Sequence, residues 1–210
     1  VAFPGGGGAN ESMIYLETAR VDGRERRALE KTLETTLGDV RAAVADWPAM
    51  IERIETDADS TGDPEGAELL RWLGGGMLTL LGHVTRTRAG GTTQALGICR
   101  KSAREVLAED SYARAFAWFD ASGGPGPLIV KANRLSKVHR RVPLDLFIVP
   151  MVESGRVAAL SVHAGVWTSA ALSTPPDEIP VLRRQLAATM AEFDFAPASH
   201  DGKALVHALT

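Results

Sequence analysis

Residues 144–170 are the most informative part of the chain for the fold and read LDLFIVPMVESGRVAALSVHAGVWTSA. Two runs rich in Val, Leu and Ile flank Glu153-Ser154-Gly155, a short polar segment typical of a tight turn. We therefore predict strands over 144–152 and 156–170, joined as an antiparallel hairpin. Pro150 has no backbone N–H to donate, so its strand is expected at a sheet edge or at a bulge.

Other segments also have strand character. Residues 77–86 alternate apolar and polar side chains, residues 95–100 follow across a Gly90-Gly91 turn, and residues 128–134 follow a Gly/Pro-rich breaker. A short strand-like run over 12–18 is expected to be the last strand of a preceding domain.

Helical spacing dominates the rest of the chain. Apolar residues from Leu29 to Ile54 recur every three or four positions, and Pro48 interrupts them, which predicts two helices meeting near Trp47. Further helices are predicted over 64–73, ending at Gly74 to Gly76, and over 101–119, 178–193 and the residues after Ser199. This order predicts an α+β fold: an antiparallel sheet of about five strands with helices on one side and flanking helices.

Composition excludes several function classes. The 210 residues carry 23 Lys and Arg against 26 Asp and Glu, a net charge of -3, so no nucleic-acid partner is expected. The single cysteine, Cys99, allows no intrachain disulfide, which favours a cytoplasmic location, and Cys99 itself is expected to be buried in a strand and inert. No run of apolar residues is long enough to predict a membrane-spanning helix. The start at Val1 and the end at Thr210 inside a helical pattern suggest a piece of a longer chain.

One basic cluster is a candidate contact site. Arg side chains offer paired donors to carboxylates, so we expect the cluster to hold either an anion or another domain or subunit. The alternative is a solvated edge strand that its charges protect from aggregation. The residues are Lys131, Asn133, Arg134, Lys137, His139 and Arg140, followed by Arg141.

No catalytic, cofactor or metal site is predicted. His200, Asp201 and His207 supply too few converging ligands for a metal, and Asp201 is more simply a favourable charge at a helix start. The glycine runs 5–8 and 123–126 lack the strand-loop-helix order of a dinucleotide site, and no serine lies in a nucleophile elbow. A pocket enclosed by Trp118, Phe147 and Trp167 is the remaining ligand hypothesis.

Five dispersed segments resemble the large bacterial NAD-dependent glutamate dehydrogenases. They are DVRAAVADWPAM (39–50), LRWL with TLLG (70–73 and 79–82), KANRLSKVHR with LD (131–140 and 144–145), WTSAA (167–171), and IPVLRR with PASHDGKAL (179–184 and 197–205). His83 stands where that family usually has an aromatic residue.

The resemblance implies a very long subunit whose catalytic part lies far downstream and binds NAD. It implies that residues 1–20 end an ACT-like domain, 21–63 form a helical linker, 64–175 form a PAS-like module, and 176–210 form a C-terminal helical segment. The expected role is regulation and assembly, through contacts with other domains of the same subunit and with homo-oligomer neighbours. Sensing of an amino acid or another metabolite is the alternative.

Overall fold

The computed structural model describes residues 2–4, 10–100, 106–122, 124 and 126–192. The chain divides into two compact units, Val1–Thr35 and Thr36–Thr210. The domain boundaries implied by the resemblance stay predictions.

The first unit contains a short antiparallel pair, β1 (Ala2–Pro4) with β2 (Asn10–Ser12), and the start of helix α1. The predicted strand over 12–18 is wrong, because β2 ends at Ser12 and residues 13–18 form neither a strand nor a helix. Met13 and Tyr15 are 66% and 84% exposed. Apolar alternation alone did not produce a strand there.

Helix α1 runs unbroken from Gly23 to Ser60. It begins after Asp22, whose carboxylate accepts the backbone N–H groups of Arg24 and Glu25 at 2.8 and 2.9 Å. The prediction of two helices is wrong, since Pro48 lies inside the helix on an exposed face. The buried positions Met50, Ile54 and Ala58 continue the helical spacing beyond it.

Helix α2 (Pro64–Trp72) confirms the predicted helix over 64–73. Asp63 caps its first turn, and Pro64 supplies a suitable φ without needing a hydrogen-bond acceptor. A π-helical turn, Leu73–Met77, ends it, and Gly76 takes a φ of 109° that other residues avoid. The chain then enters strand β3 (Leu78–Thr87).

The second unit is built around a five-stranded antiparallel sheet in the order β4-β3-β7-β6-β5. Its strands match the predicted ones closely, except that β4 starts earlier than expected and ends before Cys99. Their bounds are β3 (Leu78–Thr87), β4 (Thr92–Gly97), β5 (Leu128–Leu135), β6 (Pro143–Glu153) and β7 (Arg156–Trp167).

The predicted hairpin joins β6 to β7. Its two turn residues, Ser154 and Gly155, have φ values of 50° and 77°, the left-handed pair that matches the twist of an antiparallel hairpin. Pro150 lies in an inner strand, but past Ile148, the last residue of β6 that pairs with β5. The strand is therefore locally an edge at Pro150, and a register shift follows at Met151.

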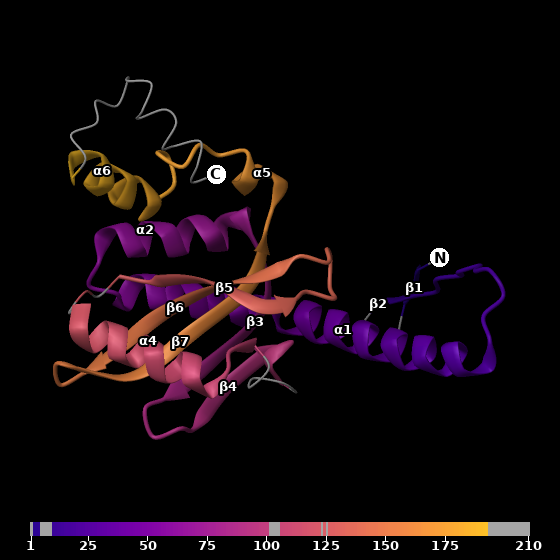
Figure 1. The fold of residues 1–210 in the computed structure, drawn as a ribbon. Helices are drawn as coiled ribbons and strands as arrows, with labels where there is room; N and C mark the ends of the chain where they lie inside the picture. Colours follow the sequence, from indigo (N-terminus) through magenta and orange to yellow (C-terminus); the bar gives the residue numbers. More distant parts are fainter. Residues whose placement is uncertain (1, 5–9, 101–105, 123, 125, 193–210) are drawn as a thin grey trace. The chain divides into compact units, whose positions relative to one another are not determined.

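Helices cover both faces of the sheet, so the prediction of helices on one side is wrong (Figure 1). Helix α4 (Glu109–Ser122) packs Tyr112, Phe116 and Phe119 against one face, over Leu146 and Val162. The second half of α1 and α2 pack against the other face, over residues such as Phe147 and Val149. The helix predicted over 101–119 is described from residue 106: Val106 is helical, residues 107 and 108 interrupt the helix, and α4 then runs past the predicted end to Ser122.

The described chain ends with two helices, α5 (Ser169–Leu172) and α6 (Leu182–Glu192). Helix α6 starts later than the predicted residue 178 and buries Leu186 and Met190. The helix predicted after Ser199, with His200, Asp201 and His207, lies outside the described residues. Within the described part of the chain, no helix is both long enough and apolar enough to span a bilayer.

Candidate functional site

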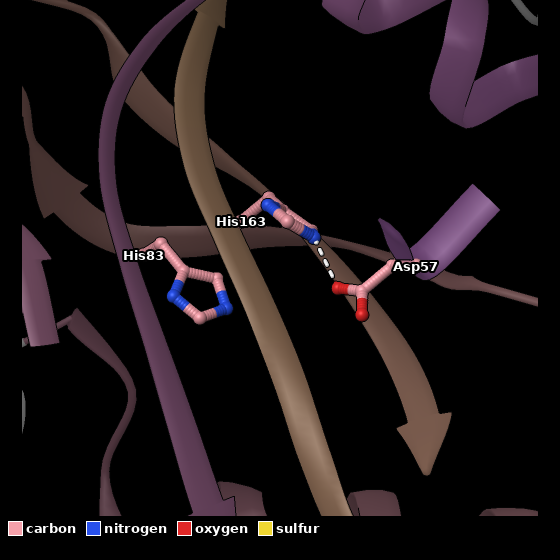
Figure 2. A group of neighbouring side chains, drawn as sticks. All are labelled: Asp57, His83 and His163. Carbon is pink, nitrogen blue, oxygen red and sulfur yellow. Dashed lines mark hydrogen bonds and ion pairs between the residues drawn. The ribbon is translucent and has the colours of Figure 1, made fainter. Parts of the chain in front are cut away.

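A buried polar cluster lies between the end of α1 and the middle of the sheet. Along β7, Leu160, Val162 and Ala164 join the α4-side core, so Ser161 and His163 point to the opposite face. His83 on β3 stands directly across from His163 in the strand register. Asp57, on the last turns of α1, lies over both histidines, and Figure 2 shows the three side chains converging.

Asp57 is the hub of the cluster. Its Oδ2 accepts the hydroxyl hydrogen of Ser161 and lies 2.8 Å from Nε2 of His163. Its Oδ1 accepts a hydrogen bond from Arg53 Nη2 at 2.6 Å, one helical turn away. Burial raises the pKa of the Asp57 carboxyl, but the hydrogen bonds and charges of His163, Ser161 and Arg53 outweigh it, so the pKa lies below its ordinary value.

His83 extends the network toward the surface. Its Nε2 lies 2.8 Å from Ser161 Oγ, and its Nδ1 lies 3.1 Å from the backbone carbonyl of Gln94. Burial, together with the nearby His163, lowers the pKa of His83 to about 3, so the ring is neutral at physiological pH. The two imidazoles lie 4.9 Å apart between ring centroids.

A hollow of about 340 Å³ opens beside the buried cluster, and His83 and Arg53 are among its lining residues. Gln94 adopts a φ of 50°, which is uncommon for a residue with a side chain. This backbone presents its carbonyl to His83, while its side-chain oxygen lies 3.4 Å from Arg53. The lining residues are Ala49, Glu52, Arg53, Thr56, His83, Gln94 and Leu96.

Sequence reasoning missed this cluster. It treated His83 only as a departure from a family pattern and assigned no role to Asp57 or His163. The alternation of side chains along the strands could have indicated it. On β3 and β7 the histidines and Ser161 alternate with apolar residues that point to the opposite face of the sheet, which is also buried. Polar side chains at such positions are expected to need partners when a helix covers that face.

The predicted basic cluster lies on β5 and the loop after it. Lys131 forms an ion pair with Asp145 of β6 at 2.8 Å, and Arg140 donates to the backbone carbonyl of Trp167, so contacts inside the chain hold both. Lys137 and His139 are exposed. Arg134, near the end of β5, is half-buried, and the side chain of Asn133 lies outside the described set. An anion or interdomain role for these residues stays a prediction.

The predicted aromatic pocket is wrong. Phe147 and Trp167 do lie together, with ring centroids 5.6 Å apart, and Trp72 contacts Trp167 at 5.8 Å. Trp118 instead meets Phe119 of α4 edge to face, across the sheet from Phe147, and is 45% exposed. Strand alternation separates residues that the sequence analysis had placed around one cavity.

Comparison with known proteins supports the resemblance drawn from the motifs. The chain is similar to NAD-specific glutamate dehydrogenases. It is 28% identical to the enzyme of Halomonas elongata over 224 aligned residues and 27% identical to that of Pseudomonas aeruginosa over 222, covering 96% of this chain in both cases. A family model described as glutamate dehydrogenase, helical motif 1, matches residues 179–210. The chain spans 14% of the length of each relative.

Proposed function

We propose that this chain is a non-catalytic regulatory and assembly module of an NAD-dependent glutamate dehydrogenase. The parent reaction would be the oxidative deamination of L-glutamate to 2-oxoglutarate, with NAD bound elsewhere in the parent. Support comes from similarity that runs along 96% of this chain yet covers only 14% of each relative. In this proposal residues 1–20 end an ACT-like domain and 64–175 form a PAS-like module.

The observation that carries the assembly role is an apolar surface on α1, formed by Leu37, Val44 and Trp47. These side chains are 56%, 70% and 53% exposed. Beside them lies a hollow of about 280 Å³ whose lining is almost entirely apolar and includes Val40, Ala43, Leu80 and Val138. Adjoining apolar side chains around a hollow are typical of a surface that another protein segment covers.

The expected occupant is another segment of the same parent subunit. Most of the length of each relative lies outside the aligned region. A partner segment in that part of the subunit would be covalently attached and therefore present at high effective concentration. Contact with an attached segment needs little intrinsic affinity, which suits a surface of this modest size. The exposed His139, on the rim of the hollow, gives the partner one polar contact.

The test compares the double variant Val44→Glu/Trp47→Glu in the full-length parent and in this chain alone. Because both side chains are exposed, this chain should keep its thermal unfolding midpoint. The parent should lose its native assembly by size-exclusion chromatography with light scattering, or lose the domain contact as judged by limited proteolysis. Arg71→Glu, an exposed site on α2, is the matched control. An unchanged parent would contradict the proposal, and so would glutamate-dependent NAD reduction by this chain alone.

Metabolite sensing is the second candidate, because the hollow beside Gln94 places a cation and an anion, Arg53 and Glu52, on one lining. A small zwitterion would match that pair of charges. Thermal-shift measurements against amino acids and dicarboxylates test this function, since a ligand that binds the native state raises the unfolding midpoint. A saturable shift that Arg53→Gln abolishes would support sensing, and no shift with any compound would reject it.

A further inference from the structure

The buried cluster has fewer hydrogens than contacts. Four contacts run in a chain: Gln94 carbonyl to His83 Nδ1, His83 Nε2 to Ser161 Oγ, Ser161 Oγ to Asp57 Oδ2, and Asp57 Oδ2 to His163 Nε2. Each needs one hydrogen. A neutral His83, the Ser161 hydroxyl and the Nε2–H of His163 supply one each, and an ionised Asp57 supplies none. One contact therefore joins two lone pairs.

A second proton on His163 would not repair the deficit, because it would sit on Nδ1, which has no partner among the described residues. His83 and His163 are both fully buried and lie 4.9 Å apart between ring centroids, a place where an added positive charge would be poorly solvated. Protonation of Asp57 is opposed by Arg53, which donates to its other oxygen. The cluster thus has an excess of lone pairs that a cation would satisfy.

The donor set suits a transition metal. Asp57, His83 and His163 each bring a ligand atom, and these atoms all lie within 4.8 Å of one another. Bonds of about 2.0–2.2 Å in tetrahedral geometry place ligand atoms about 3.3 Å apart, so small movements would bring these ligands to an ion. Two imidazoles with one carboxylate favour zinc-like ions over magnesium or calcium, which prefer oxygen ligands.

The surroundings are those that orient metal ligands. The Gln94 carbonyl fixes the hydrogen of His83 on Nδ1, which leaves the Nε2 lone pair facing the cluster. His83 thus donates its other ring N–H as metal-binding histidines usually do, whereas Nδ1 of His163 has no partner among the described residues. The hollow lined by His83 and Arg53 offers a path from solvent.

We propose that Asp57, His83 and His163 bind one divalent transition-metal ion, with zinc as the expected occupant, between the end of α1 and the central strands of the sheet. The ion replaces the missing hydrogen, and Ser161 or a water takes the fourth position. Its role is to hold α1 on the sheet. The proposal goes beyond the regulatory function and does not depend on it.

The first test uses the unmodified chain. After treatment with a chelator, titration with Zn²⁺ should show one ion per chain and should raise the thermal unfolding midpoint. Co²⁺ should give the visible absorption bands of a tetrahedral nitrogen and oxygen site, without a thiolate charge-transfer band. Binding of less than one equivalent, or no thermal shift, would overturn the proposal whatever the variants do.

Variants then assign the ligands. Asp57→Asn, His83→Gln and His163→Gln should each weaken Zn²⁺ binding by at least about tenfold. The triple variant His139→Gln/His200→Gln/His207→Gln and the variant Cys99→Ala, which remove the other histidines and the cysteine, should leave binding unchanged. Binding that persists without both His83 and His163 would contradict the assignment.

Arg53→Gln gives a test in the opposite direction. It removes the positive charge next to Asp57, so Zn²⁺ should bind about tenfold more tightly. The reason is that repulsion between two positive charges is screened least where both are buried. A cluster that serves only as a hydrogen-bond network would gain nothing from this change. Weaker or equal Zn²⁺ binding in this variant would count against the site.

Discussion

Arg184 of α6 donates two hydrogen bonds, of 2.6 and 2.8 Å, to the carboxylate of Asp63, the residue that caps α2. The same carboxylate accepts the backbone N–H of Gly66 at 3.2 Å. Asp63 therefore caps α2 and also binds Arg184 of α6, which lies 121 positions away along the chain.

Asp63→Ala should destabilise the chain by about 1–2 kcal/mol, because it removes the cap of α2 and leaves a buried N–H without a partner. Equilibrium urea unfolding followed by circular dichroism measures this change. Asp59→Ala is the matched control, since Asp59 pairs with Arg71 on an exposed surface where ion pairs contribute little. Equal losses in the two variants would contradict the capping role.

The pairing also predicts a pH dependence. The hydrogen bonds from Arg184 hold the pKa of Asp63 below its ordinary value of 3.8. A depressed folded-state pKa means that the stabilisation is fully present above the unfolded value and is lost as the pH falls through the folded one. The difference in unfolding free energy between the native chain and Asp63→Asn should thus be constant near neutrality and shrink below pH 3.8. A difference that does not vary with pH would refute this account.

Local signals made the sheet predictable. The turn at Ser154-Gly155 and the alternation in the flanking strands depend on neighbouring residues, and both were read correctly. The placement of the helices was predicted wrongly, although Leu146 to Val149 is a continuous apolar run. Such a run indicates a strand buried on both faces, which requires helices on both. This apolar run therefore indicated helices on both faces of the sheet.

The polar cluster was harder to foresee because its parts are distant in sequence. His83 and His163 meet only through the pairing of β3 with β7, and Asp57 reaches them only because α1 crosses that face. Strand alternation could have marked both histidines as inward-facing. No local pattern, however, assigns a helical aspartate to a particular pair of strands.

Gly97→Ala should destabilise the chain by about 2 kcal/mol or more, a size that backbone strain and overpacking produce. Gly97 has a φ of 57°, and a Cβ there would lie 2.1 Å from the carbonyl oxygen of Leu81. The matched control is Gly75→Ala, where a Cβ meets nothing within 4 Å. Thermal unfolding midpoints of the two variants check the contrast, and a tolerated Gly97→Ala would rule out the close strand approach.

Cys99 should resist thiol reagents in the native chain. It is fully buried, although not in a strand as the sequence suggested, and burial raises the pKa of its thiol to about 12. Because the thiolate is the reactive form, labelling with Ellman's reagent should be negligible at pH 8 and complete in denaturant. Rapid labelling of the native chain would show that the segment around Cys99 opens readily.

Pro48 offers the last prediction, because α1 continues through it. Proline lacks the N–H that would bond to the carbonyl of Val44, and inside a helix it costs about 3 kcal/mol relative to alanine. Pro48 is exposed, so Pro48→Ala removes no core contact and should stabilise the chain by about 1–3 kcal/mol in urea unfolding. Ala45→Gly, one turn earlier on an exposed face, should lose about 1 kcal/mol and confirm that this part of the helix is formed. Destabilisation by Pro48→Ala would mean that the native direction of α1 at this point depends on the proline. The hydrogen bond from the backbone N–H of Gly97 to Asp46 would then depend on Pro48 as well.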